Sequence, residues 1–478
     1  MKKARFPFTR SPAALLWATF LAALLFILAP LQHRPAPPPP PSLLHLIVAY
    51  DSVPHGTDGA ERYLAAVVRG LAALPRVRVT FAARSTAGAC GASPADSLAL
   101  GPAVAIREAA PGSPEFARLL AAPGAALLLP LSFFATCSGA GANASSEDYS
   151  AALRALHPAP RRGAPPLLVF AFDAQAARLA GLAAHEPSAA HARRYAEAAA
   201  AEGAREAALY ARADAFAMLT PEDLAATPPA WTRPGVPRLV VGFRDEVDAR
   251  LRDGALPPLA RAQRVRQALP PFAARSGFVF MGGGNNPTNV LALHYFLLRA
   301  WPLLRARVPG ATLHVVGPPP SRACREHGVW CGWLAGTQYD GAPPEASGIV
   351  LHGLVEDPRA VLAVARVALA PLVCGTGINT KTGYYLAQGL PVVGTEKGVR
   401  GYGSGAGLAG GGGYSAAALE AGAGGGEAMA AEAARLHEQQ EAWEAASTGA
   451  LQRTALLEDE RAAAADLHEL ARVLRALQ

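Results

Sequence analysis

Cysteine is scarce in this sequence, and dense clusters of charge are missing. The five cysteines occur without the paired C-x-x-C spacing typical of zinc sites, so we expect no metal site. Cys324 and Cys331 are the only close pair, and they could bridge in an oxidising lumen or remain ordinary thiols. The net charge of +7 is spread thinly, without a basic block interleaved with aromatic residues. This pattern argues against nucleic-acid binding.

The length of the chain favours more than one domain. At 478 residues it is too long for one ordinary hydrophobic core, and two domains are the natural expectation. Hydrophobic residues make up 51% of the chain, so there is ample apolar material for burial.

The amino terminus carries a basic tail at 1–12, followed by an uncharged run at 13–29. This run is at the short edge of what spans a bilayer, but it is longer than most signal-peptide cores. Because a basic flank stays in the cytosol, we predict a signal-anchor transmembrane helix at 13–32 in a single-pass type II arrangement. A cleaved signal peptide, which would give a secreted protein, is the main alternative. An organellar transit peptide is a weaker one.

A proline-rich stem follows at 33–42, where a polyproline II spacer would hold the rest of the chain away from the membrane. Asn143 begins an N-glycosylation sequon, which is compatible with lumenal exposure. We therefore expect a lumenal head on the Golgi or endoplasmic reticulum membrane.

The range 43–250 alternates predicted strands, among them apolar runs at 125–131 and 167–171, with predicted helices, which indicates a doubly wound α/β domain. His55 lies in the turn after its first strand, where open α/β sheets bind ligands, although a turn-stabilising role is as good an explanation. Asp173 follows a buried strand directly. It is a candidate for chemistry or a simple helix cap.

A second α/β domain is predicted at 276–402, after a linker at 251–275 rich in proline, alanine and arginine. Within this domain we expect one helix from Val290 to Arg307. A Gly/Ala low-complexity loop at 403–426 and carboxyl-terminal helices at 427–478 complete the chain. Leucines at 467, 470, 474 and 477 form a stripe that we interpret as packing against the first domain.

The stretch from Leu369 to Val393 predicts a strand, a glycine loop, a helix and a second strand. Gly375 and Gly377 let backbone N–H groups face a ligand, and Lys381 follows one helical turn later. This arrangement suits a phosphate, but a tight strand-to-helix turn needs glycine for steric reasons as well.

Four segments of the second domain, in this order, resemble the family 4 glycosyltransferases: Phe278-Val-Phe-Met-Gly-Gly-Gly, Thr312-Leu-His-Val-Val-Gly, Val350-Leu-His-Gly-Leu-Val-Glu-Asp, and Ala370-Pro-Leu through Gly389-Leu-Pro-Val-Val393. The resemblance covers 277–401 well and the first domain more loosely. It implies a GT-B architecture, in which two Rossmann-like domains face each other across a cleft. It also implies retaining transfer from a nucleotide-diphosphate sugar, with no separate cofactor.

The resemblance assigns donor binding to two glycine loops and the helix that follows the second. The residues it implies are Gly282, Gly283, Gly284, Asn285, Gly375, Thr376, Gly377, Ile378, Asn379, Lys381 and Tyr384. Lys381 would neutralise the departing diphosphate, and we take it with His55 and Asp173 as the catalytic candidates. Family members commonly carry glutamates where this chain has Thr376 and Tyr384. The second of these usually binds ribose hydroxyls. Either ribose recognition has moved, with Asn379 as one candidate, or donor binding is weak or lost.

Two functions from different classes remain open on the sequence alone. The first is a retaining glycosyltransferase that uses a nucleotide-sugar donor and a glycan, protein or lipid acceptor in the secretory pathway. The second is a non-catalytic GT-B scaffold that binds nucleotide or glycan, and it is motivated by Tyr384. A sugar-nucleotide epimerase of the same fold is disfavoured by the predicted membrane anchor.

Overall fold

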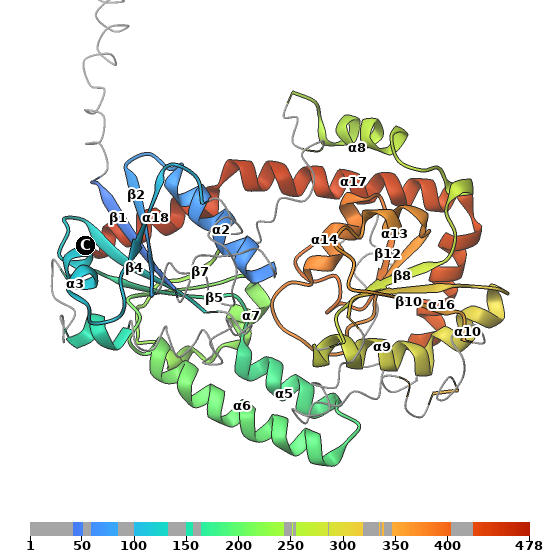
Figure 1. Ribbon diagram of the computed structural model, residues 1–478, viewed down its shortest axis with the longest axis horizontal. Helices are drawn as coiled ribbons and strands as arrows, with labels where there is room; N and C mark the ends of the chain where they lie inside the picture. The colour runs from blue at the N-terminus through green and yellow to red at the C-terminus, as the bar shows by residue number, and fades with distance from the viewer. Residues whose placement is uncertain are drawn as a thin grey trace, which may run out of the picture. The chain divides into compact units, whose positions relative to one another are not determined.

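The computed structural model describes residues 42–50, 59–84, 100–131, 150–155, 164–242, 251, 255–284, 286–318, 334, 337–338, 347–402 and 424–478. These ranges contain two parallel sheets (Figure 1). The predicted anchor at 13–32 lies outside them, and so does the predicted stem at 33–42 except for Ser42. Among the described helices, none combines the length and apolar character needed to cross a bilayer.

The first domain is built on a seven-stranded sheet of order β3-β2-β1-β4-β5-β6-β7, and all its strand pairs are parallel. The strands are β1 (Leu44–Tyr50), β2 (Val77–Ala83), β3 (Val104–Glu108), β4 (Ala125–Leu131), β5 (Leu167–Ala171), β6 (Ala215–Met218) and β7 (Arg238–Val240). The order reverses between β1 and β4, which makes the sheet doubly wound.

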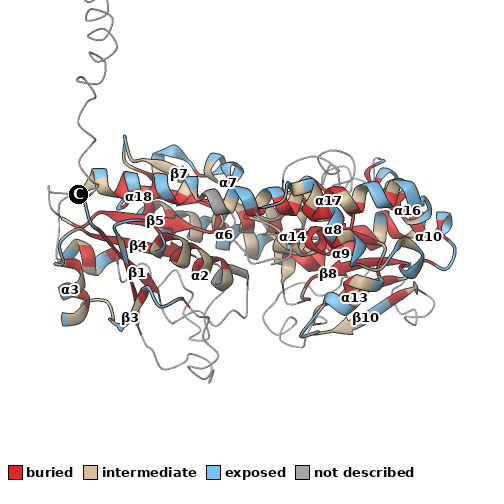
Figure 2. Cartoon of the chain, turned by 90° about the horizontal axis from the view of Figure 1, so that it is seen from above, coloured by how far each residue is buried: buried red, intermediate tan, exposed pale blue. Residues whose placement is uncertain are grey.

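Every residue of β1, β4 and β5 is buried, because a central parallel strand is covered on both faces. Successive side chains of β1 alternate between two hydrophobic clusters, so Leu46 and Val48 pack on one face and Ile47 and Ala49 on the other. Figure 2 shows these strands as buried elements between half-exposed helices.

Helices on the two faces of the first sheet come from distant parts of the chain. They are α2 (Gly59–Ala72), α3 (Pro114–Leu120), α5 (Gln175–His185), α6 (Ala189–Tyr210), α7 (Pro221–Ala226) and, from the carboxyl terminus, α18 (Ala465–Leu477). Leu467, Leu470 and Leu474 of α18 share a core cluster with α2 and β1. The predicted packing of this leucine stripe on the first domain is therefore confirmed.

The second domain contains a five-stranded parallel sheet of order β10-β9-β8-β11-β12. The strands are β8 (Phe278–Met281), β9 (Leu313–Val316), β10 (Ile349–Gly353), β11 (Val367–Ala370) and β12 (Val392–Gly394). The order reverses between β8 and β11, so this sheet is doubly wound like the first. The predicted two-domain α/β fold is confirmed.

The helices of the second domain are α9 (Pro287–Arg299), α10 (Trp301–Arg307), α13 (Arg359–Val364), α14 (Thr380–Ala387) and α16 (Gly425–Glu438). We expected one helix up to Arg307, but it is divided at Ala300. Pro302 cannot continue the hydrogen bonding of α9, whereas it fits the first turn of a new helix.

The range predicted as a linker contains α8 (Pro258–Gln267), which packs on the long helix α17 (Gln440–Ala463). Ala262 and Val265 of α8 share a small buried cluster with Leu451 and Ala455. The fully buried Arg261 pairs with Asp459. The segment that joins the two domains is thus held against the carboxyl-terminal helices.

Candidate functional site

Two glycine loops leave the second sheet at the point where its strand order reverses. Gly282–Gly284 follows β8, and Gly375–Ile378 follows the neighbouring strand β11. Ligands of open α/β sheets bind beyond the carboxyl ends of the strands at such a switch point. The topology therefore brings together two loops that are far apart in the sequence.

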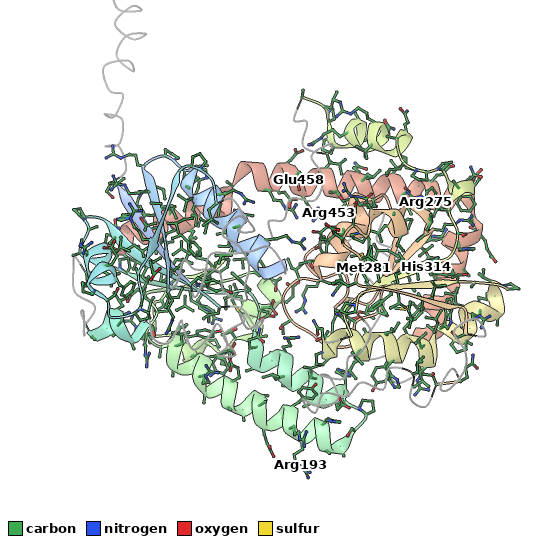
Figure 3. The ribbon with its side chains drawn as sticks, viewed as in Figure 1. Arg193, Arg275, Met281, His314, Arg453 and Glu458 are labelled. Atoms are coloured by element: carbon green, nitrogen blue, oxygen red, sulfur yellow. The ribbon has the colours of Figure 1, made fainter. Side chains whose placement is uncertain are left out.

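The loop after β8 borders a cavity of about 290 Å³. Its walls are mostly apolar, with Phe280, Val290, Leu293, Val315 and Leu351 beside the loop glycines, and Asn289 and His352 are its polar side chains. His352 is hydrogen-bonded to His314, which is labelled in Figure 3, at 2.9 Å. Burial lowers the pKa of His314, and His352 lowers it further. The cavity suits a flat, mainly apolar group with a few polar edges.

The loop after β11 is fixed by contacts with the first domain. The Gly377 N–H donates to Asp223 Oδ2 at 2.8 Å. Arg400 donates to the Gly375 carbonyl at 2.7 Å and forms an ion pair with Asp223 at 3.3 Å. Gly375 and Gly377 both have positive φ, at 122° and 68°, so glycine is required here by the backbone.

Lys381 connects the two loops. It lies in the first turn of α14, and its ammonium donates to Asn289 Oδ1 in α9 at 3.0 Å. Asn289 in turn donates to the Gly283 carbonyl at 3.2 Å. Burial lowers the pKa of Lys381 to about 8, and the positive charge of Arg178 adds to this effect. An anion placed here would therefore relieve an unfavourable concentration of positive charge.

Arg178 reaches this site from the first domain. It lies in α5 and donates to Asn286 Oδ1 at 3.2 Å, and Asn286 caps the amino terminus of α9. Burial lowers the pKa of Arg178, while the Asp173 carboxylate opposes this shift. The guanidinium thus meets the positive end of the α9 dipole, which is an arrangement that an anionic ligand would stabilise.

Two threonine hydroxyls lie buried between the loops. Thr288 in the first turn of α9 is 5% exposed, and its methyl group would be 3.1 Å from a Cβ at Gly375. Within the described ranges, neither Thr288 Oγ1 nor Thr376 Oγ1 has a hydrogen-bond partner. Buried hydroxyls normally find partners, so these two atoms indicate a polar ligand at this position.

Asp173 follows β5 and packs against Gly377, where a Cβ on the glycine would lie 3.1 Å from that of Asp173. It does not cap α5, whose N-cap residue is Ala174. Glu206 of α6 accepts instead from the backbone N–H groups of Gln175 and Ala176. Burial raises the pKa of Asp173 to about 6, and the cation of Arg178 limits the rise. Within the described residues, Asp173 Oδ1 has no hydrogen-bond partner.

The remaining residues of the second loop have structural contacts of their own. Asn379 donates its amide hydrogens to Thr382 Oγ1 at 3.1 Å and to the Gly398 carbonyl at 3.2 Å. Ile378 packs against core clusters of both domains. Tyr384 lies under the guanidinium of Arg62, which is 5.3 Å from the centre of its ring.

Several predicted residues lie outside the described ranges. These are His55, Asn285, the sequon residue Asn143, and the pair Cys324 and Cys331. Cys374, which lies within those ranges, is buried next to the second loop.

Sequence reasoning assigned no role in the site to Arg178, Asn289, Arg400 or Asp223. Their signals were weak, because Arg178 and Asp223 lie far from the glycine loops in the chain, whereas Asn289 follows the first loop closely but is one of several polar residues there. Asp173 with Arg178 one turn later, in the segment opened by Phe172-Asp173, was the best available sign.

The comparisons with known proteins agree with this geometry. The profile of the family described as Glycosyl transferases group 1 matches residues 275–438, which include both glycine loops and Lys381. No curated protein matches the sequence.

Solved structures show the same fold at low identity. Anabaena Alr3699/HepE, in complex with UDP, matches with a TM-score of 0.52 and 12% identity, covering 91% of this chain and 100% of that one. The α,α-trehalose-phosphate synthase (UDP-forming) of Burkholderia vietnamiensis matches with a TM-score of 0.51 and 13% identity, covering 90% and 98%. S. aureus TarM matches at 0.45 and 6% identity over 75% of this chain, which spans 57% of that one. The profile match thus covers the second domain and part of the carboxyl-terminal helices, and the two structures with TM-scores of 0.52 and 0.51 share the two-domain α/β fold of this chain.

Proposed function

We propose that this protein transfers a sugar, with retention of configuration, from a nucleotide-diphosphate sugar to a glycan, protein or lipid acceptor. One observation carries the proposal. Lys381 and Asn289 join two glycine loops at the switch point of the second sheet, beside two buried hydroxyls that lack partners within the described residues.

The donor diphosphate lies between the amino termini of α9 and α14. The positive ends of the two helix dipoles, the Lys381 ammonium and the Arg178 guanidinium surround this position. Thr288 and Thr376 supply hydroxyl donors for phosphate oxygens. As the bond to the sugar breaks, negative charge grows on the diphosphate, and these fixed groups stabilise it more than they stabilise the bound donor.

The nucleoside occupies the cavity of about 290 Å³ after β8. The cavity shares Asn289 and Gly283 with the diphosphate site, so one ligand can fill both without a gap. The HepE structure is a complex with UDP and the trehalose-phosphate synthase is UDP-forming, which makes uridine diphosphate sugars the first donors to test.

The acceptor approaches from the first domain, where Asp173 faces the second glycine loop. Its Oδ1 atom can accept a hydrogen bond from the acceptor hydroxyl and orient it. The departing diphosphate can take the hydroxyl proton on the same face of the sugar. Retention therefore requires no separate general base.

The test uses the purified full-length chain and a panel of nucleotide sugars. We expect one donor to raise the melting temperature and to release nucleoside diphosphate slowly even without acceptor. Lys381→Met should lower kcat/KM for that donor about 100-fold, because it removes charge that acts on the leaving group. Arg193→Met is the matched control, since Arg193 is exposed on α6 and points away from the site (Figure 3). If no nucleotide sugar binds or is turned over, the proposal is wrong.

A non-catalytic scaffold of the same fold is the second candidate, and Tyr384 is the observation that favours it. It stands where a carboxylate would hold ribose hydroxyls, and its ring is covered by Arg62 instead. On this alternative the protein binds nucleotide, but Lys381→Met leaves its biological role intact. If Lys381→Met abolishes both the biological role and sugar transfer, the scaffold alternative is excluded.

We also propose a type II anchor at 13–32 that places the head in the lumen of the Golgi or endoplasmic reticulum. The uncharged run behind a basic tail and the sequon at Asn143 support this proposal. Removal of N-glycans from the expressed protein should increase its gel mobility, and Asn143→Gln should abolish the shift. An unshifted native protein would contradict lumenal exposure of Asn143.

A further inference from the structure

We propose that Asp223 of the first domain is a positioning residue for the donor site, because it holds the second glycine loop in the shape that the donor needs. The proposal rests on the proposed function for what the loop binds. It also changes the predicted role of one residue: the Gly377 N–H serves Asp223, and the donor phosphates use other groups.

The carboxylate of Asp223 is completely buried and fully engaged. Its Oδ2 atom accepts from the Gly377 N–H at 2.8 Å and from the Thr220 hydroxyl at 2.7 Å. Its Oδ1 atom pairs with Arg400 at 3.3 Å. Thr220 also caps α7 through the Asp223 N–H, so the carboxylate is fixed by its own helix before it meets the loop.

The loop is therefore held at two of its peptide groups. Asp223 binds the N–H of Gly377, and Arg400, itself paired with Asp223, binds the carbonyl of Gly375. Thr376 lies between these two points. Its side-chain hydroxyl has no hydrogen-bond partner within the described residues. Holding both ends fixes the direction in which the Thr376 group faces the diphosphate position.

The Asp223 carboxylate could instead occupy the Gly377 N–H only in the free protein, and a donor phosphate could then displace it. The burial and the three contacts of Asp223 favour a fixed role, because displacement would leave a buried carboxylate without its hydrogen bonds, which is costly. The two domains thus share the donor site. The second domain supplies the loop, and the first domain sets its conformation.

The test compares Asp223→Ala and Asp223→Asn with Glu222→Ala, which removes the exposed neighbouring carboxylate of α7. Amide hydrogen exchange of the ligand-free full-length protein is followed in a peptide spanning 373–381 and in a reference peptide from β4. We expect Asp223→Ala to speed exchange at least about tenfold in the loop peptide only. Asp223→Asn keeps one acceptor oxygen but loses the ion pair, so it should fall between the wild type and Asp223→Ala.

Donor kinetics then separate positioning from simple stability. We expect Asp223→Ala to lower kcat/KM for the donor about 10- to 100-fold at a temperature where the variant is folded, with the acceptor KM unchanged. Glu222→Ala should match the wild type. Uniform acceleration of exchange in all peptides, or normal donor kinetics in a folded Asp223→Ala variant, would overturn the proposal. If Asp223→Ala does not fold, the same criteria apply to Asp223→Asn.

The two proposals can fail separately. If the wild type binds no nucleotide sugar, the proposed function fails. The exchange measurement on the ligand-free protein still decides whether Asp223 holds the loop.

Discussion

The two glycine loops of the second sheet leave neighbouring strands, but their glycines meet different demands. A Cβ at Gly283 would lie 3.5 Å from Pro318, which is ordinary van der Waals contact, and its other side borders the cavity. A Cβ at Gly377 would lie 3.1 Å from the Cβ of Asp173 and 3.2 Å from the Phe172 carbonyl, at a φ of 68°. The first glycine leaves room for a ligand, whereas the second allows a close contact between domains in a backbone conformation that other residues avoid.

The same substitution in each loop should separate these two demands. Gly377→Ala places a methyl group against backbone and imposes positive φ on alanine, so we expect the free energy of unfolding to fall by about 2 kcal/mol or more. Donor binding should also be lost, because the loop can no longer keep its bond to Asp223. Chemical denaturation and calorimetric titration with UDP measure the two effects.

Gly283→Ala is the matched comparison. We expect its free energy of unfolding to stay within about 0.5 kcal/mol of the wild type, with only a moderate loss of UDP affinity from the narrower cavity. Equal destabilisation by the two variants would contradict the distinction between the loops.

The fold could be predicted well from the sequence where strands are continuous apolar runs. The strands predicted at 125–131 and 167–171 agree with β4 and β5 at both ends, because fully buried parallel strands leave a clear apolar signal. The break between α9 and α10 was missed, although Pro302 marked it.

The site was predictable only in part, because several of its contacts join the two domains. Local glycine spacing pointed to Gly375, Gly377 and Lys381. By contrast, the sequence contains no sign that Asp223 meets Gly377, since the two are 154 positions apart and the contact depends on how the domains pack. Asn379 looked like a ligand-binding residue, but its amide hydrogens hold Thr382 and Gly398.

The pH dependence of donor binding tests whether the positive charge of Lys381 contributes to UDP binding. Its pKa of about 8 means that the ammonium is present below this pH in the free protein and is lost as the pH rises through it. The second ionisation of phosphate is complete near pH 7 and above, so the charge of the ligand changes little in this range. We therefore expect the Kd for UDP to rise above pH 8, by at most about tenfold per pH unit.

Calorimetric titration from pH 7 to 9.5 at constant ionic strength measures this effect. Lys381→Arg should remove the inflection, because a guanidinium stays charged throughout the range. An inflection that persists in this variant would assign it to another group.

The smallest effect is expected at another contact between the domains, where Arg62 of α2 lies 5.3 Å from the centre of the Tyr384 ring. Both residues are only partly buried, so this cation–π contact should hold α14 less firmly than Asp223 holds the glycine loop. Tyr384→Ala removes the ring, and we expect the Kd for UDP to rise about two- to fivefold. Tyr384→Phe keeps the ring and should bind UDP like the wild type. If phenylalanine weakens binding as much as alanine does, the hydroxyl rather than the ring carries the effect. Tyr384 would then act on the proposed donor as a polar group.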